Sequence, residues 1–157
     1  MKHKILILIC LLQVTLLTSA QDHLGIKNIF DKHGKQEGSV LVQLASDVLS
    51  QGSNITLYKS LVMNYNTQKE QDILFYLKQD ITSIISEVKK NGKTESGTYL
   101  VGSGKDKVYE YILYKNKSNK ITVVYLRGTF PPKKLDSELN KLKDLFIYVN
   151  NKRLKIQ

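Results

Sequence analysis

The stretch VYEYILYKNKSNKITVVYLRGTF, Val108–Phe130, decides the fold of this chain. Two runs of β-branched and aromatic residues, Val108–Lys115 and Ile121–Phe130, flank the polar segment Asn116–Asn119. This pattern is typical of a β-hairpin. Because a lone hairpin is marginally stable, we expect the remaining strands and helices to pack around it.

The two faces of this predicted hairpin differ in charge. A four-residue loop would place Tyr114 opposite Ile121 and Tyr109 opposite Leu126, although a one-residue change in loop length would alter which faces match. One face then carries Glu110, Tyr125 and Arg127, and the other carries Tyr109, Tyr111, Leu113, Val124 and Leu126. We expect the second, uncharged face to form the core.

The longest predicted helix begins at Thr67. The segment Thr67–Glu70 fits a capping box, in which hydroxyl and carboxylate satisfy free backbone N–H groups. An apolar stripe at helical spacing then extends the prediction to Asn91-Gly92, through Ile73, Leu77, Ile81, Ile84 and Val88.

Shorter elements surround this helix and the hairpin. A helix is predicted over Asp22–His33, where Gly34 stops it by adopting a left-handed backbone. A second follows Pro131-Pro132, with its apolar side at Leu135, Leu139, Leu142 and Phe146. Further strands are predicted over Ser39–Ala45, Ile55–Met63 and Thr98–Val101.

The end of the chain is less sharply defined. Leu145–Val149 fits either a helix end or a strand, and a small hairpin could follow through Asn150-Asn151. The predicted fold is a single α+β domain over residues 21–157. It has an antiparallel sheet of about four to six strands, packed against a long central helix and shorter N- and C-terminal helices.

Residues 1–20 have the pattern of a secretory signal peptide. Lys2 and Lys4 precede the apolar run Ile5–Leu17, and Thr18-Ser19-Ala20 provides small residues before a cleavage site. We therefore expect export, with cleavage after Ala20, to the periplasm or cell envelope. The alternative is an uncleaved anchor.

The only cysteine, Cys10, lies inside this predicted signal peptide. A lipoprotein is not favoured, because bulky Ile9 precedes Cys10 and more apolar residues follow it. Cleavage would leave no thiol, and so no disulfide-linked partner. It would also remove Lys2 and Lys4, leaving 22 basic and 14 acidic residues, a net charge of +8 with His neutral.

The excess of positive charge lies in the second half of the chain. Lys115, Lys117 and Lys120 gather around the hairpin loop, and Lys152, Arg153 and Lys155 lie near the end. The first three are candidates for weak contact with an anionic membrane or other anionic partner. The alternative is an ordinary solvated surface. Nucleic acid is a poor partner for an exported protein.

Motifs for catalysis and cofactors are missing from the sequence. Gly102–Lys105 resembles the end of a P-loop, but Tyr99 stands at the first glycine position and Asp106 replaces the Ser/Thr. His23 and His33 lack zinc-ligand spacing, and no G-x-S-x-G elbow occurs. We therefore expect no cofactor, no metal and no enzymatic activity.

The order of features resembles small exported proteins of Bacteroidetes that are classed as domains of unknown function. The resemblance rests on F-x-K-[HY]-x-x-x-x-G, here Phe30, Lys32, His33 and Gly38, and on a late strand-Gly signature, here Leu126, Gly128, Phe130 and Leu135. It covers nearly all of residues 21–157. It implies an α+β fold and export, and it brings no catalytic residue.

The leading functional hypothesis is a non-enzymatic domain that binds an envelope protein or surface. A second is a carrier or sensor of a small apolar ligand, held between the sheet and the long helix. A third is a hydrolase with an unrecognised site.

Overall fold

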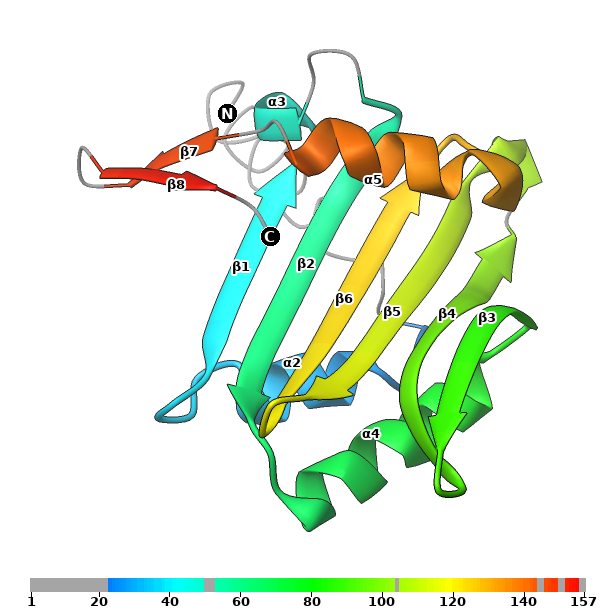
Figure 1. Ribbon diagram of the computed structural model, residues 1–157. Helices are drawn as coiled ribbons and strands as arrows, with labels where there is room; N and C mark the ends of the chain where they lie inside the picture. Colours follow the sequence, from blue (N-terminus) through cyan, green and yellow to red (C-terminus); the bar gives the residue numbers. More distant parts are fainter. Residues whose placement is uncertain (1–22, 50–52, 104, 144–145, 150–151, 156–157) are drawn as a thin grey trace, which may run out of the picture.

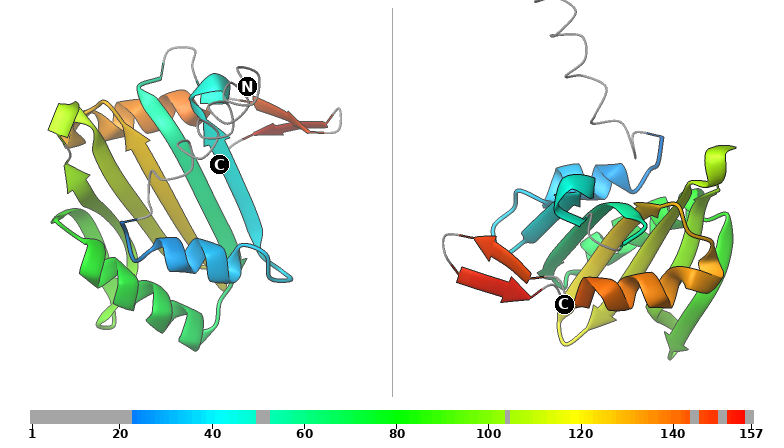
Figure 2. Two further views of the ribbon diagram at one scale, coloured as in Figure 1. Left: turned by 180° about the vertical axis from the view of Figure 1, so that it is seen from behind. Right: turned by 90° about the horizontal axis from the view of Figure 1, so that it is seen from above.

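A six-stranded antiparallel sheet with helices on both faces forms the body of the protein (Figures 1 and 2). The computed structural model describes residues 23–49, 53–103, 105–143, 146–149 and 152–155. The spatial order of the strands is β1-β2-β6-β5-β4-β3. Their bounds are β1 Val40–Ala45, β2 Ile55–Asn64, β3 Ser83–Lys90, β4 Lys93–Ser103, β5 Tyr109–Lys117 and β6 Lys120–Gly128. The predicted α+β class and antiparallel sheet are confirmed.

The helices are short and lie on opposite sides of the sheet. Helices α2 (Lys27–His33) and α4 (Thr67–Asp80) cover one face, which we call the back face; α5 (Leu135–Lys143) crosses one end of the other, the front face (Figures 1 and 2). The remaining helical turns are α3 (Ser46–Leu49), η2 (Lys105–Lys107) and η3 (Pro132–Lys134). None of the helices in the described residues is long and apolar enough to span a membrane.

The predicted hairpin is present as β5 and β6, with a tighter turn than expected. Only Ser118 and Asn119 connect the strands, both with positive φ (54° and 59°). This suits a two-residue turn, whose left-handed backbone matches the twist of the strands. The register therefore pairs Tyr114 with Val123 and Tyr111 with Leu126, two residues away from the predicted pairing. An even shift leaves every side chain on its predicted face.

The uncharged face of the hairpin is in the core as predicted, but the opposite face is buried as well, which was not predicted. On the front face, Tyr111 and Leu126 pack in a cluster with α5. On the back face, Ile112 and Tyr125 pack against α2 and α4. The charged residue Glu110 did not prevent burial because it accepts a hydrogen bond of 2.9 Å from the Tyr125 hydroxyl.

The predicted long helix is also wrong: α4 ends at Asp80. Ile81 already has an extended backbone (ψ 122°), and Ser83–Lys90 forms the edge strand β3. The isoleucines and valine that suggested a helical stripe are β-branched and favour strands. Pairing with β4, which is much longer than the predicted Thr98–Val101, decides between the two structures.

Gly34 ends helix α2 without the left-handed backbone that was predicted for it. Helix α2 ends before Gly34 as expected, but Gly34 keeps a right-handed backbone (φ −64°). A Cβ there would lie 2.8 Å from Leu41 Cδ2, so glycine permits close packing. The left-handed residue is Gly38 (φ 74°), in the connection to β1.

The C-terminal segments resolve the ambiguity between helix end and strand at Phe146–Val149, while Leu145 lies outside the described residues. Helix α5 is confirmed up to Lys143, and Phe146 belongs to a strand instead of extending the helix. The strands β7 (Phe146–Val149) and β8 (Lys152–Lys155) pair as a small separate hairpin. The predicted signal peptide, its cleavage site and Cys10 lie outside the described residues.

Candidate functional site

The structure brings the three candidate lysines together on one face of the sheet. Lys115 and Lys117 lie on β5 and Lys120 on β6, and the register pairs Lys117 with Lys120 and Lys115 with Thr122. All three side chains are exposed. With Ser118 and Thr122 they line an open hollow of about 240 Å³.

This hollow adjoins a part of the front face that α5 leaves uncovered (Figure 1). A second hollow of about 220 Å³ shares Lys115 and Thr122 with the first. Its apolar part comes from Leu113 and Val124, and its hydroxyl groups from Ser86, Ser96 and Thr98. We call these two hollows and the three lysines the basic face.

The basic face is one-sided in charge. The register aligns its lysines with residues of all six strands, and none of those neighbours is acidic. The aligned residues are Val40, Val62, Asn64, Val88, Ser96 and Thr122, and the adjacent row adds Val42, Ser60, Ser86, Thr98, Leu113 and Val124, again without an acidic residue. Such a surface attracts anions, and its hydroxyl groups add hydrogen-bond donors.

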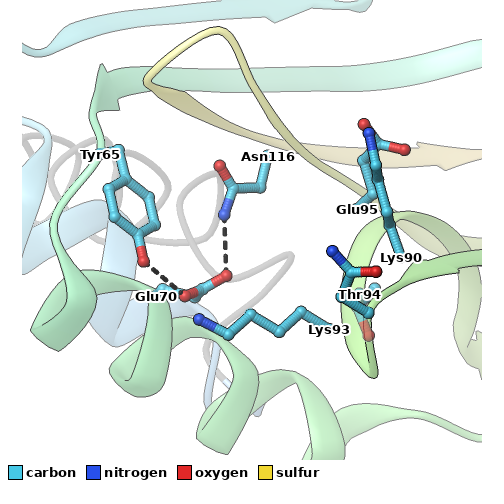
Figure 3. A pocket seen from close by; sticks show the side chains of 8 residues that line it. Tyr65, Glu70, Lys90, Lys93, Thr94, Glu95 and Asn116 are labelled. Carbon is cyan, nitrogen blue, oxygen red and sulfur yellow. Dashed lines mark hydrogen bonds between the residues drawn. The ribbon is translucent and has the colours of Figure 1, made fainter.

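A second candidate site surrounds Glu70, in the first turns of α4 (Figure 3). The predicted capping box is wrong, because Asn66 caps the helix through its side-chain oxygen, 2.8 Å from the backbone nitrogen of Gln68. The Glu70 carboxylate instead accepts hydrogen bonds from Tyr65 Oη (3.1 Å), Asn116 Nδ2 (2.8 Å) and Tyr114 Oη (3.4 Å). Glu70 is only 7% exposed.

Glu70 lies at the wall of an open pocket of about 420 Å³. The opposite wall is the tip of the β3–β4 hairpin, from which Lys93 extends its ammonium group toward Glu70 (Figure 3). The remaining lining residues are Tyr65, Lys90, Asn91, Thr94, Glu95 and Asn116. The pocket therefore offers both signs of charge to a polar ligand.

Burial and the Glu70 carboxylate together raise the pKa of Tyr114 above its ordinary value. A neutral Tyr114 hydroxyl remains a hydrogen-bond donor throughout the physiological pH range. Sequence reasoning missed this site because its partners lie 44 and 46 residues from Glu70, and because the pocket's other wall was predicted to be helix.

Two further buried carboxylates hold the fold together. Glu110 accepts hydrogen bonds from Tyr125 and from His23, whose Nε2 lies 3.0 Å away. Glu138 accepts from the backbone nitrogen and the side-chain amide of Asn54, both at 2.9 Å, and from Lys141. Although desolvation raises the pKa of Glu138, the hydrogen bonds from Lys141 and Asn54 outweigh it and leave the pKa below its usual value.

The two histidines in the described residues, His23 and His33, each lie within hydrogen-bond distance of a side chain of the protein. His23 pairs with Glu110, and the Nδ1 of buried His33 lies 3.0 Å from Gln36 Oε1. Within the described residues, no group of three or more His, Cys, Asp or Glu side chains is arranged to hold a metal ion. The Gly102–Lys105 segment, whose sequence resembles the end of a P-loop, begins at the end of β4.

Comparison with known proteins places this chain in a family. No curated protein matches the sequence. The model of a family of unknown function, DUF6108, matches residues 13–139, which include every strand of the large sheet. The chain therefore belongs to the DUF6108 family.

Proposed function

We propose that this protein is a non-enzymatic binding domain of the cell envelope, and that its basic face contacts an anionic surface. One observation carries the proposal: three lysines lie on one face of the sheet, and none of the aligned neighbours is acidic. The export pattern of residues 1–20 supports the location. The Bacteroidetes resemblance is consistent with it.

The expected attraction is modest. A lysine near an anionic membrane contributes about 1 kcal/mol, so three contribute about 3 kcal/mol. This corresponds to roughly a hundredfold in affinity. An attraction of this size strengthens a weak contact but does not by itself select one partner. It therefore suits binding to an anionic surface better than tight binding of a small molecule.

Packing argues against the apolar carrier. The layer between the back face and its helices is filled by side chains at 0–2% exposure, among them Ile26, Ile29, Phe30, Ile73 and Leu77. The hollows described above are open and lined partly or mainly by polar groups. The buried carboxylates support a binding domain more than a hydrolase, because tyrosine and amide groups hold them in place.

Vesicle binding tests the proposal. Residues 21–157 should co-sediment with vesicles of phosphatidylglycerol and phosphatidylcholine at low salt, and not with phosphatidylcholine alone. Binding should mostly disappear at about 0.5 M salt, where the screening length falls below its physiological value of roughly 8 Å.

The variant K115Q/K117Q/K120Q should bind at least about tenfold more weakly while remaining folded. The matched control is K35Q/K69Q/K78Q, which removes the same charge from α4 and the connection before β1. If both triple variants lose binding equally, only net charge matters and the basic face is not a site. If the unaltered protein ignores anionic vesicles at low salt, the proposal fails.

A second candidate function is binding of a small zwitterion in the Glu70 pocket. Glu70 is buried and held by three donors, yet no cationic side chain in the described part of the chain pairs with it within 4.0 Å. A ligand ammonium group would supply that charge, and Lys90 or Lys93 would face its carboxylate.

Isothermal titration with free amino acids and dipeptides tests this second function. Binding to the unaltered protein should be lost in E70Q and weakened in K93Q. The absence of binding by any of these compounds would remove the candidate.

A further inference from the structure

The two edges of the large sheet are protected very differently. At one edge, β3 carries Glu87, Lys89 and Lys90 and has two register irregularities against β4. Charges and bulges are the usual devices that prevent an edge strand from pairing with another chain. At the other edge, β1 has the sequence VLVQLA, without a charge or proline, and pairs with β2 over six residues without a break.

The unprotected edge is also exposed and apolar. Val40 is 60% exposed and Leu41 is 39% exposed. Strand β1 ends the strand order of the large sheet, and no strand in the described part of the chain pairs with its outer side; the β7–β8 hairpin, which lies beside one end of β1 (Figure 1), pairs only with itself. A bare edge of this kind is a template for strand addition.

We propose that β1 pairs with β1 of a second copy of this chain, antiparallel, around a two-fold axis at Val42. This register places Val40 opposite Leu44 of the second copy and Leu41 opposite its Gln43. Val42 lies opposite its own counterpart. Directly opposite residues share a face, so the pairs Val40–Leu44 and Val42–Val42 form a continuous apolar row on the front side.

The chemistry of β1 favours a second copy over a different partner. An uncharged strand offers no ionic group for a charged partner to recognise, and self-pairing places apolar side chains beside apolar ones. The positive charges of the basic face do not oppose it, because β2 lies between β1 and Lys120, and Lys115 and Lys117 lie one strand further on. A two-fold interface requires only such a self-complementary patch.

The resulting dimer has a defined shape. Two six-stranded sheets joined at β1 form one sheet of twelve strands. The two-fold axis of an antiparallel pair is perpendicular to the sheet, so both front faces lie on the same side. The dimer therefore presents both basic faces in one direction.

Light scattering after size exclusion provides the first test. The unaltered protein should have the mass of two chains at micromolar concentration. V40K should shift it to one chain, because a lysine at this position would be buried against Leu44 of the partner copy. The control I84K introduces the same charge at an apolar residue with similar exposure (57%) on the β3 edge, and should remain a dimer.

Disulfide cross-linking tests the register. With Cys10 replaced by Ser, V42C should form a cross-linked dimer under mild oxidation, because opposite Cα atoms lie about 4.5–5.5 Å apart. V40C should not, because the two copies of this residue lie four positions apart, about 13 Å along the strands.

Several results would overturn the proposal. One is a single-chain mass at all concentrations, which would also result if the β7–β8 hairpin beside the end of β1 covers this edge (Figure 1). Others are dimerisation that survives V40K and is lost in I84K, and cross-linking through Val40 without Val42.

Discussion

Replacing Glu70 by Gln should destabilise the fold by about 2 kcal/mol. Hydrogen bonds to a charged group contribute about 1.5–3 kcal/mol, and neutral ones about 0.5–1.5 kcal/mol. The substitution keeps the shape, but it removes the charge and replaces one of the two accepting oxygens by an NH2 group. One short hydrogen bond therefore loses its acceptor and the other becomes neutral, with a combined cost of about 2 kcal/mol. Two are short, from Tyr65 and Asn116, while the third, from Tyr114, is already long at 3.4 Å.

Urea denaturation measures this loss directly. We expect a lower midpoint with an unchanged slope, because the surface exposed on unfolding is the same. The matched control is Glu95→Gln, a half-buried residue that lines the same pocket without a hydrogen bond to Glu70. Its effect should stay within about 0.5 kcal/mol.

Two results would refute the reasoning. One is a loss below about 0.5 kcal/mol for E70Q, which would mean that the charge contributes nothing to these bonds. The other is additivity of E70Q and N116A, since residues that share a hydrogen bond should show a coupling free energy in a double-mutant cycle.

Three further predictions concern other parts of the fold. Leu77→Ala should lower the free energy of unfolding by about 2–5 kcal/mol in the same denaturation assay, because Leu77 is buried in the core, whereas Phe75→Ala, at a 60% exposed residue of the same helix, should change it little. Tyr111→Phe should cost about 1 kcal/mol by thermal or urea unfolding, because it leaves the buried Phe130 carbonyl without the hydroxyl that now lies 2.6 Å away. Glu138→Gln should reduce the loss of stability in acid: the folded-state pKa of Glu138 is lowered, so its contribution is present above the unfolded pKa and disappears as pH falls through the folded one. Urea midpoints compared between neutral and acidic pH check this, and an unchanged acid sensitivity would contradict it.

Alternation along the chain was sufficient to predict the faces of the central hairpin. Glu110, Tyr125 and Arg127 share the back face as expected, and Leu113 and Val124 share the front face. Turn length was not predictable, because Ser118-Asn119 lacks the Asn-Gly sequence that usually marks a two-residue turn. The error moved the register by two residues and therefore left the faces intact.

The helix prediction failed over Ser83–Lys90, where the spacing of the apolar residues suits a helix but the residue types also suit a strand. Ile81, Ile84 and Val88 follow helical spacing, yet they are β-branched residues that also suit a strand. The choice depends on β4, which follows across the Asn91-Gly92 turn and pairs with this segment. Tertiary pairing of this kind is outside the reach of a local pattern, and the pocket wall at the β3–β4 tip was missed with it.

The three candidate lysines also have an ordinary explanation, which is that they keep an exposed sheet face soluble. Helix α5 covers only part of the front face, and an uncovered sheet face needs polar groups to remain soluble. Solubility alone, however, favours interspersed charges of both signs, and acidic residues serve it at least as well as lysine. The absence of acidic side chains among the six residues aligned with Lys115, Lys117 and Lys120, and among the six of the adjacent row, is therefore not explained by solubility. The anionic partner proposed above would explain it, and the comparison of the two triple variants decides between these causes.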